Sequence, residues 1–195
     1  MDAGGTAKWW RVVAGIGGCL VLAWFSIVRD VRVPLLGLVD LGFHELGHLL
    51  TYPLPDVWTA AMGSVTQVSV PLGLAAYFVA VRRDLMGGAV CLAWAGTSAR
   101  DAAVYIADAP FERRELIGGE HDWAFVLGSE HLDALDAAGT VASVVRVGGT
   151  LLAVAAVGSL VGVLVRDYVR ERASRTPAVS LPPAPDLGFG GRGGA

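Results

Sequence analysis

The sequence predicts an all-α membrane protein, a polytopic bundle of about five transmembrane helices. Two observations predict this fold class. Of the 195 residues, 54% are hydrophobic and only 17% are charged, whereas a soluble domain carries about 25% charged residues. The hydrophobic residues also lie in long blocks, and not at the spacing of an amphipathic surface helix. Long apolar blocks are typical of helices that cross a bilayer.

The first three expected spans are residues 9–28, 31–52 and 64–81. Basic residues and tryptophans at the ends of the first block mark the two membrane interfaces. After Arg32 the second block is apolar except for Asp40, His44, Glu45 and His48, and it stops at Pro53, because proline cannot continue a helix. The third block is short and contains a glutamine and a proline, so a re-entrant or interfacial segment is an open alternative to a full span.

The last two expected spans are residues 85–109 and 139–165. The fourth carries three charged residues near its end, where Pro110 stops it, and the fifth contains a single arginine. Beyond residue 168 the chain becomes rich in arginine and then in proline and glycine, a composition that cannot bury a core. We therefore expect a membrane domain over residues 1–168 and a disordered tail over residues 169–195.

The basic residues predict an orientation. If all five blocks span, the N-terminus shares one side with the connections 53–63 and 110–138, while 29–32, 82–84 and the tail share the other. The second side carries nine Lys and Arg residues and the first side four. Because basic residues accumulate on the cytoplasmic side, we expect a cytoplasmic tail on an integral protein of a bacterial or archaeal cell membrane.

The segment from His44 to His48 reads HELGH, an HExxH motif inside the second expected span. On a helix the two imidazoles lie at i and i+4 on one face, where they can bind one Zn²⁺, and Glu45 can act as the general base for a water molecule. The alternative is that these three polar side chains bind no metal and find their hydrogen-bond partners where the helices pack. Inside a membrane ionisable groups are costly and usually functional, so the sequence favours a zinc site.

A catalytic zinc normally takes three protein ligands, and this motif supplies two. The fourth expected span carries Thr97, Asp101, Tyr105 and Asp108 at helical spacing, as a polar stripe that must face protein or water. Both aspartates lie near the depth of the histidines, at about 1.5 Å of rise per residue. Depth alone leaves Asp101 and Asp108 open as the third ligand.

Three more residues are candidates for the surroundings of the site. Asp40 lies four residues before His44, where its carboxylate either orients that imidazole or pairs with an intramembrane arginine. His121 and Asp122 lie in the polar connection before the last span. Either Asp122 caps a helix that starts at Trp123, with His121 exposed, or both residues belong to the site.

HELGH inside a membrane helix, followed by an intramembrane aspartate, resembles the site-2-protease-like intramembrane zinc metalloproteases. With YIADA at 105–109 and GGEHDW at 118–123, it is similar to a poorly characterised group of small bacterial membrane proteins of that type. The resemblance covers roughly residues 35–150 and implies that the two histidines bind zinc and that Glu45 activates water. The chain lacks the NxxPxxxxDG-like pattern of typical members, so Asp108, in the shared YIADA segment, becomes the expected third ligand.

The expected function is therefore that of an integral membrane zinc metallopeptidase acting on a membrane-associated protein or peptide, with the lipid bilayer as its other partner. Two alternatives remain open. One is a zinc-dependent hydrolase of a lipid-linked ester or amide, and the other is a membrane scaffold that binds a metal without turnover. No run of like charge is long enough to form a nucleic-acid surface, so nucleic acid is not an expected partner.

Overall fold

The computed structural model describes residues 3–114 and 120–175, and every regular element in these ranges is a helix. The prediction of an all-α chain is confirmed. The elements, in chain order, are α1 (Ala3–Ala23), η1 (Trp24–Val28), α2 (Leu36–Thr51), α3 (Asp56–Ala80), α4 (Leu85–Asp108), α5 (Asp122–Leu127), η2 (Leu135–Ala137) and α6 (Ala138–Arg175).

Within these ranges three helices are long and apolar enough to cross a membrane, at Trp9–Val28, Asp56–Ala80 and Leu135–Ser174. The third expected span, the shortest of the five, is thus part of a long apolar helix. The second expected span differs, because residues 29–35 are not helical and α2 has only 16 residues. A span needs about 20 residues, so the prediction of five full spans is not confirmed.

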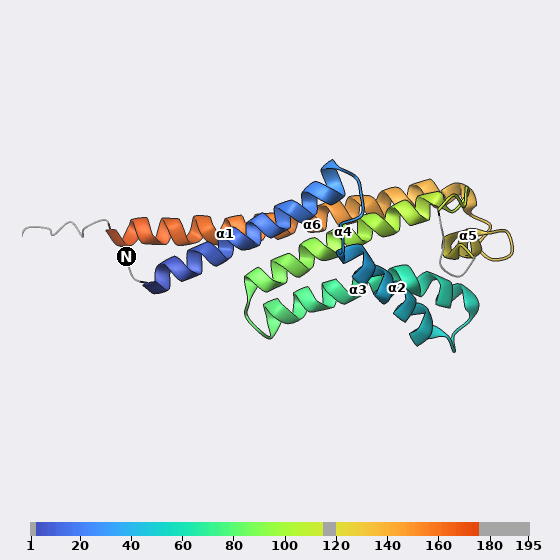
Figure 1. Cartoon of the computed structure of the whole chain (residues 1–195), viewed down its shortest axis with the longest axis horizontal. Helices are drawn as coiled ribbons and strands as arrows, with labels where there is room; N and C mark the ends of the chain where they lie inside the picture. Colours follow the sequence, from blue (N-terminus) through green and yellow to red (C-terminus); the bar gives the residue numbers. More distant parts are fainter. Residues whose placement is uncertain (1–2, 115–119, 176–195) are drawn as a thin grey trace, which may run out of the picture.

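α2 does not fold back beside α1, but runs obliquely away from the end of α1 (Figure 1). Cys19 of α1 lies against Ala89 near the start of α4, where its thiol is 3.8 Å from the Ala89 carbonyl oxygen. His44 of α2 lies beside Tyr105 near the end of α4, with 5.8 Å between the ring centroids. The two contacts place α1 and α2 one after the other along α4, although α2 itself crosses α4 obliquely (Figure 1).

Charge pairs attach the break between α1 and α2 to the bundle, although the side chains of Asp30 and Arg32 remain about half exposed. Asp30 accepts hydrogen bonds from Arg100 of α4 and Arg146 of α6, each at 3.0 Å. Arg32 pairs with Asp101 of α4 at 2.7 Å. The expected placement of this segment on the far side of a membrane from the N-terminus stays a prediction, because its charged residues are paired with the bundle and are also partly exposed.

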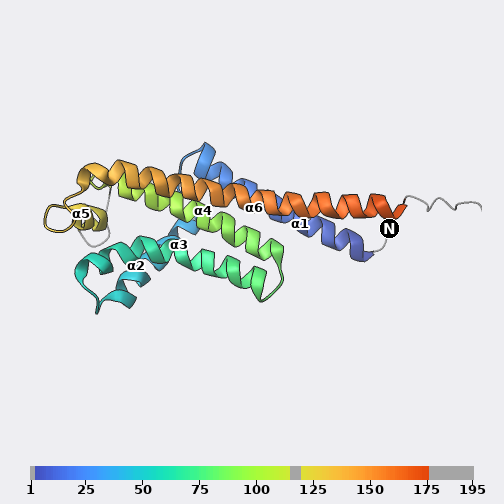
Figure 2. The same ribbon diagram turned by 180° about the vertical axis from the view of Figure 1, so that it is seen from behind.

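α6 is longer than the expected fifth span. It runs to Arg175, past the boundary expected at residue 168, so the first part of the expected tail is helical. Residues 176–195, the remainder of that tail, lie outside the described residues. Seen from behind, the end of α6 lies beside the start of α1 at one end of the molecule, and α5 lies at the other (Figure 2).

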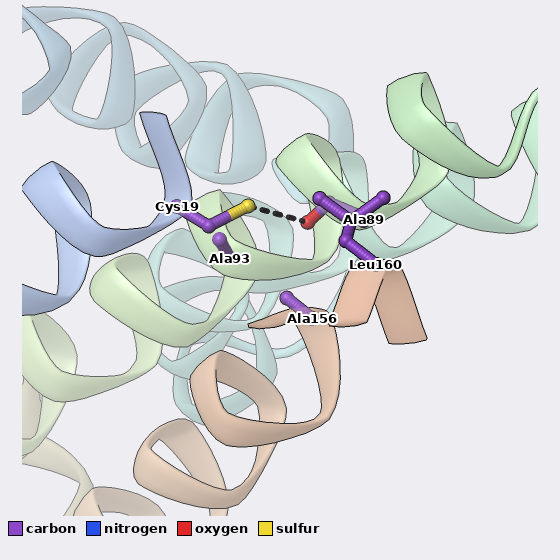
Figure 3. Close-up of a cluster of buried hydrophobic side chains, with 5 residues drawn as sticks. All are labelled: Cys19, Ala89, Ala93, Ala156 and Leu160. Atoms are coloured by element: carbon purple, nitrogen blue, oxygen red, sulfur yellow. Dashed lines mark hydrogen bonds between the residues drawn. The ribbon is translucent and has the colours of Figure 1, made fainter. Parts of the chain in front are cut away.

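Small residues form the packed centre of the bundle. Figure 3 shows a cluster from α1, α4 and α6 in which alanines predominate: Cys19, Ala89, Ala93, Ala156 and Leu160. Further along, the backbones of α4 and α6 touch, and a Cβ atom on Gly149 would lie 2.7 Å from the carbonyl oxygen of Gly96. Close approach of helices through small residues is typical of membrane bundles, where packing replaces the hydrophobic effect.

Large apolar side chains cover the outside of the same helices. On α6, for example, Leu151 is 63% exposed, and on α1 Leu20 is 52% exposed. Water-soluble proteins rarely expose broad apolar surfaces of this kind. An apolar surface around a core of small residues is the arrangement that helices require in lipid.

Candidate metal centre

His44, His48 and Asp122 meet in space, and one potential ligand atom from each lies within 4.8 Å of the others. The Asp122 carboxylate oxygen Oδ2 is 3.0 Å from Nε2 of His44 and 3.4 Å from Nε2 of His48. The histidines come from α2 and the aspartate from the first residue of α5. The structure thus brings a carboxylate to the two imidazoles of the HExxH motif.

The backbone of α3 sets the tautomer of His48. Nδ1 of this ring lies 2.9 Å from the carbonyl oxygen of Thr59, which can only accept a hydrogen bond, so Nδ1 carries the proton and donates it. In the neutral ring, Nε2 then has a lone pair that faces the Asp122 carboxylate. Two electron-pair donors at this distance require a proton or a metal ion between them. A backbone carbonyl on the second nitrogen is the usual partner of a metal-binding imidazole.

Gly63 of α3 leaves the space in front of the imidazoles open. A Cβ atom at this position would lie 2.6 Å from Nε2 of His48 and 2.7 Å from Nε2 of His44. Zinc binds imidazole nitrogen at about 2.0–2.1 Å, so any side chain at Gly63 would compete with an ion for this space. The residues present therefore fit a metal ion, both in their donor atoms and in the room they leave.

Asp122 is held ionised in this position. Burial opposes its ionisation, but the interactions with His44 and His48 are stronger and lower the pKa of Asp122 below its usual range. The Tyr105 hydroxyl donates to Oδ2 of Asp122 at 3.2 Å, and the Asp122 backbone N–H donates to the Tyr105 oxygen at 3.1 Å. Tyr105, expected near the site, thus contacts the carboxylate directly.

His121 is buried, and not exposed as in the first of the two alternatives given for it above. Its side chain is 2% exposed and is itself the N-cap of α5, since Nδ1 accepts a hydrogen bond from the Ala124 N–H at 3.2 Å. The ring stacks on Tyr105 with centroids 4.2 Å apart. Burial lowers the pKa of His121 below its usual value. The ring lies beside the candidate ligand group and is not part of it.

Asp108, the expected third ligand, lies elsewhere. Its Oδ2 accepts hydrogen bonds from the backbone N–H groups of Arg113 and Arg114, at 3.1 and 3.0 Å, and is 3.6 Å from Nε2 of His121. As the last residue of α4, Asp108 satisfies donors of the turn that follows. The structure therefore places Asp122, and not Asp108, with the two histidines.

The other two aspartates fasten helices together. Asp101 pairs with Arg32, and Asp40 accepts hydrogen bonds from Trp94 Nε1 at 2.7 Å and Ser98 Oγ at 2.8 Å. Neither of the two partners expected for Asp40, a motif histidine or an arginine, forms a hydrogen bond with it in the described ranges. Asp40 lies one helical turn before His44 on α2.

A polar cavity of about 290 Å³ opens at the break between α1 and α2. Asp40, Thr97 and Asp101 are among the residues that line it. The polar stripe of α4 therefore faces protein and this cavity over its first half, and faces the ligand group at Tyr105. The expectation that the stripe avoids lipid is met.

Glu45 is exposed beside the ligand group. Within the described ranges its carboxylate forms no hydrogen bond or salt bridge. It is the residue next to His44 on α2, so its carboxylate is free to take a proton near the two imidazoles.

Sequence reasoning missed the contribution of α3. Thr59 acts through its backbone carbonyl, Gly63 through its missing side chain, and Ser64 through a hydrogen bond of 3.0 Å that it accepts from Trp123 Nε1. A carbonyl group and a hydrogen atom have no signature in a single sequence. Two adjacent small residues, Gly63 and Ser64 at the start of an expected span, were the one feature of the sequence that could have indicated this contribution.

No protein-family model, curated protein or solved structure matches this chain. The side chains and their geometry are therefore what indicates a function.

Proposed function

We propose that the protein is an integral membrane zinc metallopeptidase whose metal centre consists of His44, His48 and Asp122. The observation that supports it most directly is the meeting of Asp122 with the HExxH imidazoles, with His48 already in a ligating tautomer. Two imidazoles and one carboxylate are a ligand set of catalytic zinc, which keeps a fourth position open. Zinc bound there would supply a polarising charge and a water-derived nucleophile at neutral pH.

Glu45 is the general base and acid of the proposed reaction. Its carboxylate is exposed next to the ligand group, so it can accept a proton from the attacking water and deliver it to the leaving amine. Large apolar side chains on α2 face outward beside it, including Leu49 and Leu50. This surface supports a substrate that reaches the site from the bilayer, as a membrane-associated protein or peptide does.

The proposal places the ligand group at the end of the bundle away from the cytoplasm. In this arrangement α1 and α2 together make one pass, and α3 and α6 make two more. α4 is not among the three most apolar helices, but it packs between α3 and α6 and makes the fourth pass, so the start of α1 and the end of α6 lie on one side. That end carries eight basic residues: Lys8, Arg11, Arg82, Arg83, Arg166, Arg170, Arg172 and Arg175. The connection at the opposite end carries Arg113 and Arg114. The positive-inside rule then makes the end with both termini cytoplasmic.

The test is peptide cleavage by protein reconstituted in liposomes with zinc and a mixture of synthetic transmembrane peptides, read by mass spectrometry. We expect cleavage by the wild type, none by Glu45→Gln, and normal cleavage by Glu130→Gln, a control glutamate exposed in the last connection. Equal cleavage by Glu45→Gln and the wild type would contradict the proposal. Glu45-dependent release of an acyl group from a lipid-linked ester, without peptide cleavage, would favour the lipid hydrolase instead.

A further inference from the structure

We propose that His121 is a positioning residue that holds Asp122 and Tyr105 in the geometry that metal binding needs. The inference rests on the proposed metal centre and adds to it a residue that contacts neither the ion nor the substrate. Three contacts of the ring, through its two nitrogens and its face, support this role.

The first contact fixes the backbone of the aspartate. His121 Nδ1 accepts a hydrogen bond from the Ala124 N–H and so caps α5, whose first residue is Asp122. The position of Asp122 at the start of this short helix depends on the cap, because the first N–H groups of a helix have no partner within it. The same hydrogen bond leaves the ring proton on Nε2.

The second contact fixes the side chain of the aspartate through Tyr105. The imidazole stacks on the phenol ring at 4.2 Å with 23° between the planes. The Tyr105 hydroxyl in turn accepts from the Asp122 N–H and donates to its carboxylate. His121 therefore holds Asp122 from two directions, through the peptide chain and through the phenol.

The third contact is incomplete. Nε2 of His121 is the buried side-chain atom that has no hydrogen-bond partner in the described ranges. It points to Oδ2 of Asp108, 3.6 Å away, and that carboxylate is anchored at the end of α4 by two backbone N–H groups. The Nε2–H group therefore faces a carboxylate that the end of α4 holds in place, and this contact fixes the orientation of the ring.

The experiment measures zinc affinity by competition with a chelator, and the visible spectrum of the cobalt(II)-substituted protein, for purified full-length variants. His121→Asn keeps an oxygen that can cap α5 but loses the ring, and His121→Phe keeps an aromatic ring but loses the cap and the polar contact with Asp108. His131→Asn, an exposed histidine of the same connection, is the matched control. Partners that orient a ligand typically contribute about 10- to 100-fold in metal affinity.

We expect both His121 variants to bind zinc at least about tenfold more weakly and to show an altered cobalt spectrum. The control should match the wild type, and the thermal midpoints of the metal-free proteins should stay close together. Wild-type affinity and spectrum in either folded His121 variant, while Asp122→Ala has lost zinc, would overturn the positioning role and leave the metal centre standing. Absence of zinc binding in the wild type would overturn the metal centre itself.

Discussion

The carbonyl oxygen of Thr59 and the missing side chain of Gly63 prepare the two histidines for a metal. The first fixes which nitrogen of His48 carries the proton, and the second keeps the space in front of both Nε2 atoms open. Neither needs a polar side chain. The backbone of a helix can thus arrange metal-binding side chains in an apolar environment. Its polar groups already have hydrogen-bond partners in the helix, so no further polar side chain has to be buried.

Replacement of Gly63 by alanine should abolish zinc binding. The new Cβ atom would lie 2.6 to 2.7 Å from both ligating nitrogens, in the space that the ion needs. Gly73→Ala is the matched control, because a Cβ atom at this position of the same helix meets nothing within 4 Å. Zinc content, measured by mass spectrometry on the purified variants, should fall in the first protein alone. Full zinc content in Gly63→Ala would place the ion elsewhere.

The residue scale also shows where prediction from sequence ends. HExxH identified the histidines and Glu45, because their spacing on one helix face is local information. The third member of the group depends on how the connection after α4 folds back, and the structure places Asp122 with the histidines where Asp108 was expected. Asp108 had the right depth, but its carboxylate is occupied by the N–H groups of the turn that it starts.

At the scale of elements, α4 was predicted almost residue for residue, and α2 was not. α4 has a charged N-cap, Asp84, and a proline soon after its end, and both are local signals. The block 31–52 has enough apolar residues for a span, but Pro34 and the charge pairs of Asp30 and Arg32 shorten its helix. Such pairs join residues that are far apart in sequence, so hydropathy alone cannot show them.

The contact between α4 and α6 gives a stability prediction. In Gly149→Ala the new Cβ atom would lie 2.7 Å from the Gly96 carbonyl oxygen and 3.0 Å from Arg100 Cγ, so the helices must separate. Overpacking of this kind costs about 1–3 kcal/mol. The neighbouring change, Gly148→Ala, meets nothing within 4 Å and should be neutral or slightly stabilising. Thermal unfolding in detergent compares them, and equal midpoints would argue against the close contact.

At the scale of the whole molecule, we predict a four-pass arrangement with the start of α1 and the end of α6 on one side. The prediction follows from the order of α1 and α2 along α4, which the Cys19–Ala89 and His44–Tyr105 contacts define. It differs from the five-span arrangement in one testable respect, the side on which the N-terminus lies.

Cysteine labelling in intact cells distinguishes the two arrangements. In a background without the two native cysteines, Thr6→Cys and Ser174→Cys should both be protected from an impermeant maleimide, and Glu130→Cys should react. The reason is that the first two positions lie at the end of the bundle with most basic residues. Labelling of Thr6→Cys together with Glu130→Cys would restore the five-span arrangement.

The number of zinc ions bound per chain tests whether His44, His48 and Asp122 together hold one zinc ion. After incubation with excess zinc and removal of free metal, the wild type and Asp108→Asn should each retain about one equivalent. Asp122→Ala and His44→Ala should retain almost none, because each loses a ligand. Zinc retained by Asp122→Ala and lost by Asp108→Asn, or no zinc in the wild type, would contradict the account.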